Sequence, residues 1–322
     1  MGNHNGNNPL VSVVMPMRNA EDFVEEALVS VLQETQVPIE VVVVDDGSTD
    51  RSRAIVVGLA DPRIRIVDGP CRGFSASINT GFAAAIGEIV MQCDADDFYP
   101  TDRIRFQANW LREHPEYAAV CGAFCTIDRK GHSVADLRAG TGLVDQDIDA
   151  ELRKGITRTH FCTFATRRNV FNKLGLFREF FETGPDIDFQ LKLGESFRIG
   201  YVARNAYFYR LHDASITHTQ ASRRRIFFEE TAREFQQQRI LSGLDDLQRG
   251  TPPVAPAAAH SSASSSGAQI QGMLIGKAWR DLHMGHRGLA VKGAWRALLT
   301  QPRNAGAWAN LGKILVRVVR PK

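Results

Sequence analysis

The chain lacks the hydrophobic runs and leader segments that carry a protein into or across a membrane. Among its 322 residues, no apolar stretch approaches the roughly 18 to 20 residues of a bilayer-spanning helix. The N-terminal sequence MGNHNGNNPL has neither the basic nor the apolar part of a signal peptide. Cysteine is scarce, with five residues at irregular spacing in a chain long enough to bury a core. We therefore expect a cytoplasmic protein with reduced thiols and no disulfide framework.

Positive charge is concentrated near the C-terminus. Residues 269–322 contain ten Lys/Arg and one acid, whereas the first 268 residues contain 29 basic and 35 acidic side chains, a net charge of −6. Arg317, Arg320 and Lys322 alternate with leucine and valine. This pattern favours an anionic membrane surface as a partner, and the corresponding expectation is a peripheral location at the inner face of the plasma membrane. Nucleic acid fits less well, and the alternative is a basic face that only meets solvent.

Apolar, β-branched segments alternate with amphipathic ones over the first hundred residues. Strands are predicted at residues 10–15, 40–44, 64–67 and 88–92, and helices at 20–33, 51–60 and 74–86. Uninterrupted apolar strands between helices predict an α/β fold with a mostly parallel sheet covered on both faces. Ligands of such sheets bind beyond the carboxyl ends of the strands, so the polar clusters that follow the strands are candidate site residues.

The remainder of the chain predicts a helical extension. A long polar-faced helix is expected at 219–249, and the Pro/Ala/Ser-rich residues 250–268 read as a flexible linker. Small residues and a proline in 269–322 follow tetratricopeptide spacing, although one repeat and part of another are too few for an independent solenoid. A helical hairpin docked on the body or on a partner is the alternative. The predicted organisation is a disordered segment 1–9, a catalytic domain 10–218, the helix 219–249, the linker 250–268 and a basic helical tail 269–322.

Three carboxylates follow the strand at 88–92. Asp94, Asp96 and Asp97 would repel one another unless a cation neutralises them. Mg²⁺ and Mn²⁺ prefer oxygen ligands and use one or two protein carboxylates together with water and phosphate oxygens. The sequence therefore predicts a Mn²⁺ or Mg²⁺ site here, and the alternative is that these acids cap the turn into the next helix.

A second acidic pair follows four valines. Asp45 and Asp46 stand at the end of a buried strand, where a carboxylate can accept hydrogen bonds from a base or a ribose. By itself the sequence DDGSTD indicates only a turn with a helix cap. Asn19, after the first strand, is expected to cap the helix at 20–33.

The motifs in combination resemble family 2 glycosyltransferases over about residues 10–215. The resemblance rests on VSVVMPMRNAEDFVEEALVSVLQ, EVVVVDDGSTDRS, RGFSASINTGFAAAIGEIVMQCDADD, HFCTFATRRNVFNKLGLFRE, GPDIDFQLKL and YFYRLHDASIT. It implies a GT-A fold and transfer of a sugar from a nucleotide-diphosphate donor, usually UDP-linked, to an acceptor hydroxyl. It also implies inversion at the anomeric carbon and dependence on Mn²⁺ or Mg²⁺.

The same resemblance assigns donor-binding roles to individual positions. It places Asp46 at the base, Asp96 at the ribose or the metal, and Asp94 and Asp97 at the metal. It also implies a diphosphate or metal contact for His212, for which a purely structural role is an even alternative. Further donor contacts are implied for Pro16, Arg18, Asn19, Arg72 and Asn79, with Arg18 replacing a frequent aromatic residue and Arg72 having a surface arginine as its alternative.

Asp186 in GPDIDF matches the family's general base. A single in-line displacement needs a base on the face opposite the leaving nucleotide, so the base comes from a different part of the chain than the metal site. Asp188 is the competing candidate and Glu182 a weaker one, and helix capping is the alternative for all three.

We therefore expect an inverting, metal-dependent glycosyltransferase that adds one sugar during assembly of a polysaccharide, lipopolysaccharide or glycolipid. A processive synthase is not expected, because no Q-x-x-R-W element follows the base. A dinucleotide oxidoreductase is excluded by PMRNAED, which stands where a G-x-G-x-x-G turn is required. A non-catalytic scaffold that binds nucleotide sugars and is recruited through the helical tail is the alternative.

Overall fold

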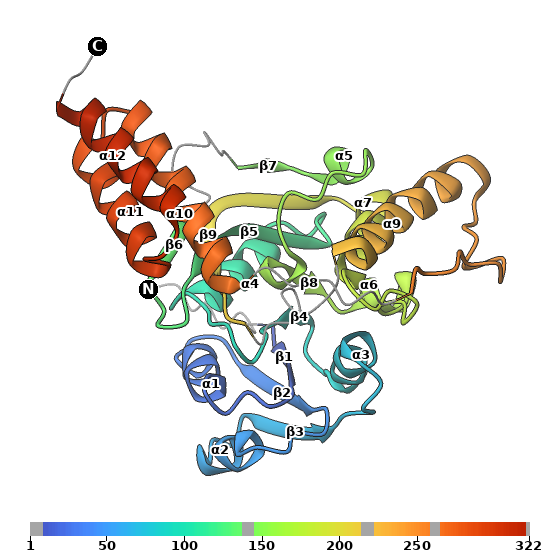
Figure 1. Ribbon diagram of the computed structural model, residues 1–322. Coiled ribbons are helices and arrows are strands. Elements are labelled where there is room, and N and C mark those ends of the chain that lie inside the picture. Colours follow the sequence, from blue (N-terminus) through green and yellow to red (C-terminus); the bar gives the residue numbers. More distant parts are fainter. Residues whose placement is uncertain (1–8, 137–144, 214–221, 258–264, 320–322) are drawn as a thin grey trace, which may run out of the picture. The chain divides into compact units, whose positions relative to one another are not determined.

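The structure is a computed structural model that describes residues 9–136, 145–213, 222–257 and 265–319 (Figure 1). The chain divides into two compact units. The first holds the described residues up to 124, 145–208 and 223–257, and the second holds 125–136, 209–213, 222 and 265–319. The predicted segment 1–9 lies almost entirely outside the described residues.

One mixed sheet runs through the fold in the order β3-β2-β1-β4-β8-β5-β9-β7, with β6 paired to β5. Strands β1 to β4 are parallel, and the pairs β4–β8, β5–β8, β5–β6 and β7–β9 are antiparallel. The predicted α/β class is confirmed, with a parallel half and an antiparallel half. The strands are β1 (Val11–Met17), β2 (Ile39–Asp45), β3 (Ile64–Asp68), β4 (Ile89–Gln92), β5 (Ala119–Ile127), β6 (Ser133–Asp136), β7 (Gln146–Asp147), β8 (Ala165–Arg167) and β9 (Ile199–Arg210).

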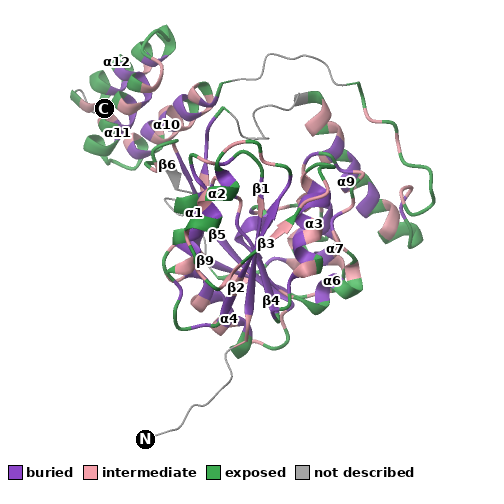
Figure 2. Cartoon of the chain, turned by 90° about the horizontal axis from the view of Figure 1, so that it is seen from below, coloured by how far each residue is buried: buried purple, intermediate pink, exposed green. Residues whose placement is uncertain are grey.

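Helices cover the parallel half on both sides. Figure 1 shows α1 and α2 on one side of β1–β3 and α3 on the other, and Figure 2 shows β1, β2 and β4 almost wholly buried. The approach of α3 is close: a Cβ added at Gly81 would lie 2.2 Å from Val14 Cγ1 and 3.0 Å from Val44 Cγ2. The helices of this unit are α1 (Val24–Leu32), α2 (Ser52–Gly58), α3 (Phe74–Ala84), α4 (Arg103–Glu113), α5 (Asp149–Leu152), α6 (Asn169–Leu174), α7 (Pro185–Ser196) and α9 (Ser222–Ser242).

The second unit contains the helical tail that the sequence predicts. Its helices are α10 (Ser266–His283), α11 (Arg287–Thr300) and α12 (Ala305–Val319). Small residues permit close packing, since Ala278 is fully buried and a Cβ added at Gly293 would lie 3.2 Å from its Cβ. Val134 of β6 and Leu211 pack with α10 and α11 through Ile270, Leu274 and Ala297.

Three element boundaries differ from expectation. Helix α1 begins at Val24 rather than residue 20, and no side chain caps it, so the predicted capping role of Asn19 is wrong. The helix predicted at 219–249 ends at Ser242, followed by Gly243 at φ 81°. Helix α10 begins at Ser266, inside the predicted linker, because the hydroxyl of Ser265 accepts a hydrogen bond from Ala268 N. No described helix combines the length and hydropathy that crossing a membrane requires.

Candidate active site

The loops that follow β1 and β2 are joined by Asn19. Its backbone has φ 51°, a left-handed conformation that asparagine tolerates better than most residues. Its N–H donates to Ser48 Oγ at 3.1 Å, and its Oδ1 accepts from Thr49 N at 2.8 Å. Asn19 thus holds the loop after β1 against the loop after β2. Pro16 lies in β1 opposite Val44, and the neighbouring Arg18 is exposed.

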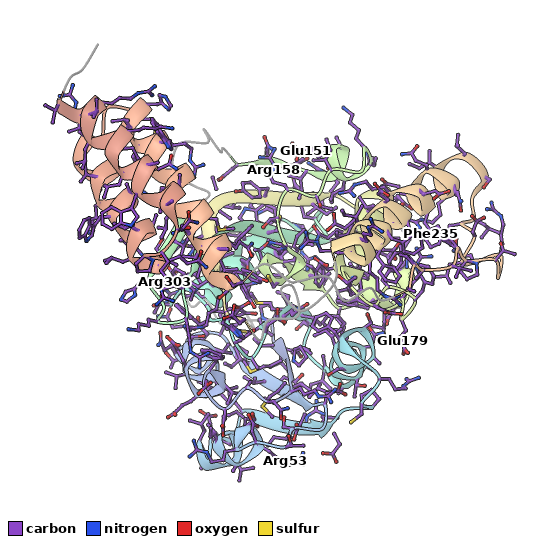
Figure 3. The ribbon with its side chains drawn as sticks, in the orientation of Figure 1. Arg53, Glu151, Arg158, Glu179, Phe235 and Arg303 are labelled. Carbon is purple, nitrogen blue, oxygen red and sulfur yellow. The ribbon has the colours of Figure 1, made fainter. Side chains whose placement is uncertain are left out.

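The two acids at the end of β2 differ in how many of their oxygens are used. Asp45 Oδ1 accepts from Ser48 N at 3.0 Å, and Oδ2 binds Arg53 at 3.1 Å (Figure 3). Burial alone would raise the pKa of Asp45, but these partners outweigh it and lower the pKa. Asp46 is 5% exposed, and its Oδ1 accepts from Cys71 N at 2.7 Å. Its Oδ2 has no hydrogen-bond partner among the described residues and remains available to a ligand.

Asp94, Asp96 and Asp97 are brought together after β4, as predicted. Asp94 N donates to the hydroxyl of Tyr207 at 2.9 Å, and Asp94 Oδ1 accepts from Gln92 Nε2 at 2.8 Å. Burial and the charges of Asp96 and Asp186 raise the pKa of Asp94 to about 7, although Gln92 acts in the opposite direction. Such mutual repulsion among oxygen ligands suits a hard divalent cation.

Asp186 stands on the first turn of α7, directly after Pro185 at the first helical position. Its Oδ2 accepts from Phe161 N at 3.5 Å and from Gln190 Nε2 at 3.3 Å. Both bonds are long, so the carboxylate is only loosely held by its own partners. Because its charge acts on Asp94, the acid cluster and the candidate base share one neighbourhood.

The competing candidates for the base have other roles. Asp188 is 1% exposed, and its carboxylate is gripped by the guanidinium of Arg178 through two nitrogens, with Arg178 Nε at 2.8 Å. A carboxylate so buried and paired has no path to an acceptor hydroxyl. Glu182 is exposed and forms an ion pair with Arg224 Nε at 2.9 Å on α9. Both predictions were alternatives to Asp186, and the structure assigns both residues to ion pairs.

Asn79 and Arg72, two of the predicted donor-binding residues, both have partners within the protein. Asn79 Nδ2 donates to Phe177 O at 2.7 Å, and Asn79 Oδ1 accepts from Phe177 N at 2.9 Å. This reciprocal pair links α3 to the segment before α7, and the donor contact of Asn79 stays a prediction. Arg72 is exposed and lies 3.3 Å from Glu179, a surface ion pair of the kind that exchanges readily for another partner.

The four predicted metal ligands do not form one preassembled cage. No group of three or more His, Cys, Asp or Glu side chains within the described residues has the spacing of a metal site. His212 is 6% exposed and belongs to the second unit, so its role as a ligand stays a prediction. The acids after β4 remain suited to a cation that takes one or two carboxylates and completes its shell with water and substrate.

Two neighbours of Asp186 were not predicted from the sequence. The ring of His160 packs on Phe124 with centroids 4.6 Å apart, and burial lowers the pKa of His160 while the charge of Asp186 acts in the opposite direction. Gln190 stands four residues after Asp186, and this helical spacing was the available signal. His160 gave no such signal, because its proximity to Asp186 arises only in the folded chain.

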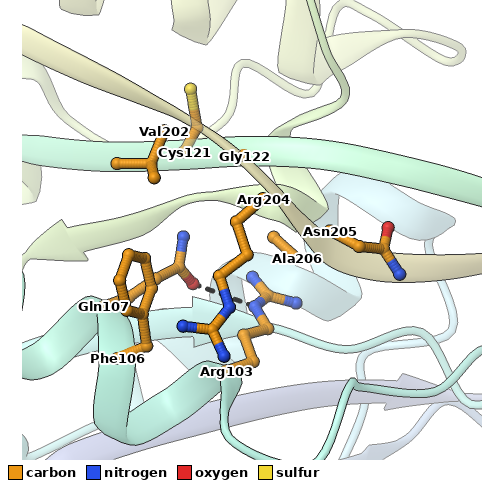
Figure 4. Close-up of a pocket in the computed structure, with 9 residues that line it drawn as sticks. All are labelled: Arg103, Phe106, Gln107, Cys121, Gly122, Val202, Arg204, Asn205 and Ala206. Carbon is orange, nitrogen blue, oxygen red and sulfur yellow. Dashed lines mark hydrogen bonds between the residues drawn. The ribbon is translucent and has the colours of Figure 1, made fainter. Parts of the chain in front are cut away.

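The cavity drawn in Figure 4 is lined by other residues. It is bounded by α4, β5 and β9 and includes Arg103, Cys121 and Asn205. Arg103 is 2% exposed, binds Gln107 Oε1 at 2.9 Å and stacks 3.9 Å over the ring of Tyr99. None of the predicted site residues lines this cavity, which is therefore a feature of the core.

Comparison with solved structures identifies the fold. S. aureus TarS (residues 1–349, in complex with UDP-GlcNAc) superposes with a TM-score of 0.57 at 17% identity, over 96% of this chain and 90% of TarS. The likeness at this identity shows the fold alone, which is GT-A.

Sequence comparison identifies the family. The profile of glycosyl transferase family 2 matches residues 12–175. A Bacillus subtilis (strain 168) protein named uncharacterized glycosyltransferase EpsJ is 30% identical over 218 residues, which are 65% of this chain and 63% of EpsJ. Chondroitin synthase of Pasteurella multocida (strain Pm70) is 27% identical over 207 residues, 63% of this chain but 21% of the synthase. The chain thus spans less than two thirds of the length of either relative. It belongs to glycosyl transferase family 2 and has a GT-A fold.

Proposed function

We propose that the chain is an inverting glycosyltransferase that moves one sugar from a nucleotide-diphosphate sugar, UDP-linked, to a hydroxyl of a glycan or lipid-linked acceptor. One observation carries this proposal: Asp186, from α7, acts electrostatically on Asp94, which follows β4. This interaction supports the inference that a base and an acidic cluster from distant parts of the chain share one site. TarS was crystallised with UDP-GlcNAc, and the name chondroitin synthase denotes synthesis of a polysaccharide. The first supports a UDP-linked donor, and the second supports a glycan acceptor.

The proposed chemistry assigns separate roles to Asp186 and Asp46. Asp186 takes the proton of the acceptor hydroxyl as that oxygen attacks the anomeric carbon from the face opposite the nucleotide. The bond from the anomeric carbon to the β-phosphate oxygen breaks, its electron pair leaves with the nucleoside diphosphate, and the configuration inverts. In this proposal Asp46 Oδ2 accepts a hydrogen bond from the nucleotide base, while Oδ1 accepts one from Cys71 N.

Asp94, Asp96 and Asp97 are the residues that would hold Mn²⁺ or Mg²⁺ with the diphosphate. Their oxygen donors and the raised pKa of Asp94 fit such an ion. When bound, the cation neutralises charge that develops on the leaving diphosphate. The protein itself contributes the orientation of these carboxylates, through Gln92 at Asp94 Oδ1 and Tyr207 at the Asp94 backbone.

The test is release of free nucleotide from a panel of UDP-, GDP- and dTDP-sugars, with Mn²⁺ or with EDTA. Asp186→Asn keeps the size of the side chain and its hydrogen-bond acceptor, so the fold is retained while the base is lost. We expect release to fall about 10²- to 10⁴-fold without loss of nucleotide binding. Glu182→Gln, which alters an exposed ion pair, is the matched control and should stay active.

Equal rates for the wild type and Asp186→Asn would show that Asp186 is not the base. Nucleotide binding by the wild type with no turnover on any donor would favour the non-catalytic scaffold instead. Rates unaffected by EDTA would remove the cation from the proposal while leaving the role of Asp186 intact.

We further propose that the acceptor belongs to polysaccharide, lipopolysaccharide or glycolipid assembly, and that the enzyme works on the cytoplasmic side of the membrane. The support is the basic helical tail, whose charge suits an anionic lipid surface.

A further inference from the structure

Asp186 depends on the position of the first turn of α7 more than on its own hydrogen bonds. Its two partners, Phe161 N and Gln190 Nε2, lie at 3.5 and 3.3 Å from Oδ2. Bonds of this length constrain a carboxylate weakly. A general base acts only when its oxygen reaches the acceptor hydroxyl in the right geometry. Something else in the structure must therefore fix the turn that carries Asp186.

The same turn carries Asp188, which points to a different side of the helix because residues two apart do not share a face. Asp188 is 1% exposed, and Arg178 binds both of its oxygens, with Nε at 2.8 Å from Oδ2. A bidentate guanidinium–carboxylate pair fixes orientation as well as distance. Holding Asp188 therefore also holds the backbone of the turn on which Asp186 stands.

Arg178 is itself held by a second buried acid. Its Nη1 lies 2.6 Å from Asp245 Oδ2, and Asp245 is completely buried in the turn after α9. Arg239 on α9 also binds Asp245 Oδ2, with Nη1 at 2.6 Å. Burial alone would raise the pKa of Asp245. The hydrogen bond from Gln248 and the interactions with both arginines outweigh burial and lower this pKa.

Arg239 extends the network to the other end of α7. Its Nη2 lies 2.7 Å from Glu195 Oε1, next to the last residue of that helix. Helix α7 is thus clamped at its first turn through Asp188 and at its last turn through Glu195. Both clamps lead to α9 and the turn that follows it, which lie beyond the family-matched residues 12–175.

Buried ion pairs contribute little net stability, because the loss of hydration offsets much of the attraction. Apolar residues already dock α9: Phe228 and Phe235 are buried against Phe181 and Leu191, and Figure 3 labels Phe235. The ion network is therefore not needed to attach the helix. What it adds is a fixed geometry for α7.

We propose that Arg178 and Arg239, bridged by Asp245, are positioning residues that hold the first turn of α7 so that Asp186 is aligned with the acceptor hydroxyl. This inference rests on the proposed function in assigning Asp186 as the base. It gives Arg239 of α9 and Asp245 of the following turn a positioning role that acts on Asp186 through α7.

The test compares Arg178→Gln with two controls in the full chain. Arg178→Gln removes the grip on Asp188 and the bond to Asp245. Arg224→Gln removes a half-buried arginine that links α9 to Glu182, and Phe228→Leu weakens the apolar docking of α9 while leaving every ion pair in place. Nucleotide release is measured with the donor that the wild type uses, well below the melting temperature of each variant.

We expect Arg178→Gln to lower kcat about 10- to 100-fold with little change in KM for the donor, because displacement of the base by about 1 Å costs that much. Arg178→Lys keeps the charge but not the fork, so its kcat should be intermediate. Arg224→Gln and Phe228→Leu should keep kcat even though Phe228→Leu melts earlier. If Arg178→Gln and Phe228→Leu melt at the same temperature and also have the same kcat, the proposal is overturned.

Hydrogen exchange gives a second measurement that does not depend on turnover. In Arg178→Gln the amides of residues 186–190 should exchange faster than in Phe228→Leu, and unchanged exchange there would also overturn the proposal. If the wild type releases nucleotide from no donor, the proposed function fails separately, and the exchange result alone decides whether the network holds α7.

Discussion

Two adjacent carboxylates at the end of β2 differ in how their oxygens are used. Asp45 binds Ser48 N and Arg53 with separate oxygens, whereas Asp46 uses only Oδ1, at Cys71 N. Gly69 lets the chain pass close to Asp46, since a Cβ there would lie 2.5 Å from Oδ1. Asp45 therefore stabilises the loop after β2, and Oδ2 of Asp46 is available to a ligand.

This difference predicts opposite consequences for Asp45→Asn and Asp46→Asn. Asp45→Asn should lower the free energy of unfolding by about 1–3 kcal/mol at pH 7, because it weakens a buried, charge-assisted set of bonds. The folded pKa of Asp45 is below its ordinary value of 3.8, so this stability is present above pH 3.8 and is lost as the pH falls through the folded pKa. Denaturant unfolding should show a constant gap from wild type at pH 5 to 8 that narrows below about pH 4.

Asp46→Asn is the control for that measurement. The asparagine Oδ1 can still accept from Cys71 N, so stability should hardly change, while affinity for the nucleotide should fall. A gap for Asp45→Asn that persists undiminished to pH 3 would show that shape, and not charge, is what the loop requires.

The residue types at the site were predictable, but their roles were not. The spacing of Asp94, Asp96 and Asp97 after an apolar strand placed them at the sheet's edge correctly. Asp186 and Asp188 look equivalent in sequence, and only the contact from Arg178 separates a base from a buried anchor. That contact spans ten residues and depends on how the chain turns between Arg178 and α7, which no local pattern encodes.

At the scale of elements, helix α3 depends on a missing side chain. A Cβ at Gly81 would lie 2.2 Å from Val14 Cγ1 on β1 and 3.0 Å from Val44 Cγ2 on β2. Both valines are buried in the sheet. Gly58, the last residue of α2, has no atom within 4 Å of such a Cβ. Gly81 and Gly58 therefore differ in what an added Cβ would contact.

Gly81→Ala should destabilise the protein by about 1–3 kcal/mol, because the added methyl forces α3 away from the strands. Gly58→Ala should be neutral or stabilise by up to about 1 kcal/mol, because alanine favours a helix over glycine. Thermal unfolding of both variants measures this directly. Equal effects would mean that helix propensity, not close approach, governs Gly81.

Alternation of strands and helices made the parallel half of the sheet predictable. Two strands of the antiparallel half were not, because β8 spans three residues and β7 two. Such segments have no periodicity of their own and become strands only by pairing with β4, β5 and β9. Tertiary contacts, not local propensity, decide these elements.

At the scale of the whole molecule, charge is divided unevenly along the chain. Residues 266–319 contain eight Lys/Arg and one acid, Asp281, which binds Lys277 at 2.9 Å. These helices also expose Trp295 and Trp308, with 51% and 55% of their surfaces accessible. Cationic and indole side chains together favour the interface of an anionic membrane.

Deleting the tail would not test this association cleanly. Val134 and Leu211 are 0% and 1% exposed because α10 and α11 pack against them. Removal of residues 265–322 would expose both and create an adhesive apolar surface. Substitution of exposed charges leaves this core intact and is the better experiment.

Lys292 on α11 and Arg303 in the turn between α11 and α12 are exposed, and Figure 3 labels Arg303. Lys292→Gln with Arg303→Gln should weaken binding to phosphatidylcholine/phosphatidylglycerol vesicles by about 1 kcal/mol per charge, or roughly 30-fold together, at low ionic strength. The matched control changes Lys154 and Arg168, two exposed cations of the first unit, and should bind like the wild type. Because salt screens surface charge, 0.5 M NaCl should remove the difference between the variants.

Co-sedimentation in which both pairs weaken binding equally would mean that net charge alone, and not the tail, governs the association. Wild-type protein that stays in the supernatant with anionic vesicles would exclude the membrane as the tail's partner.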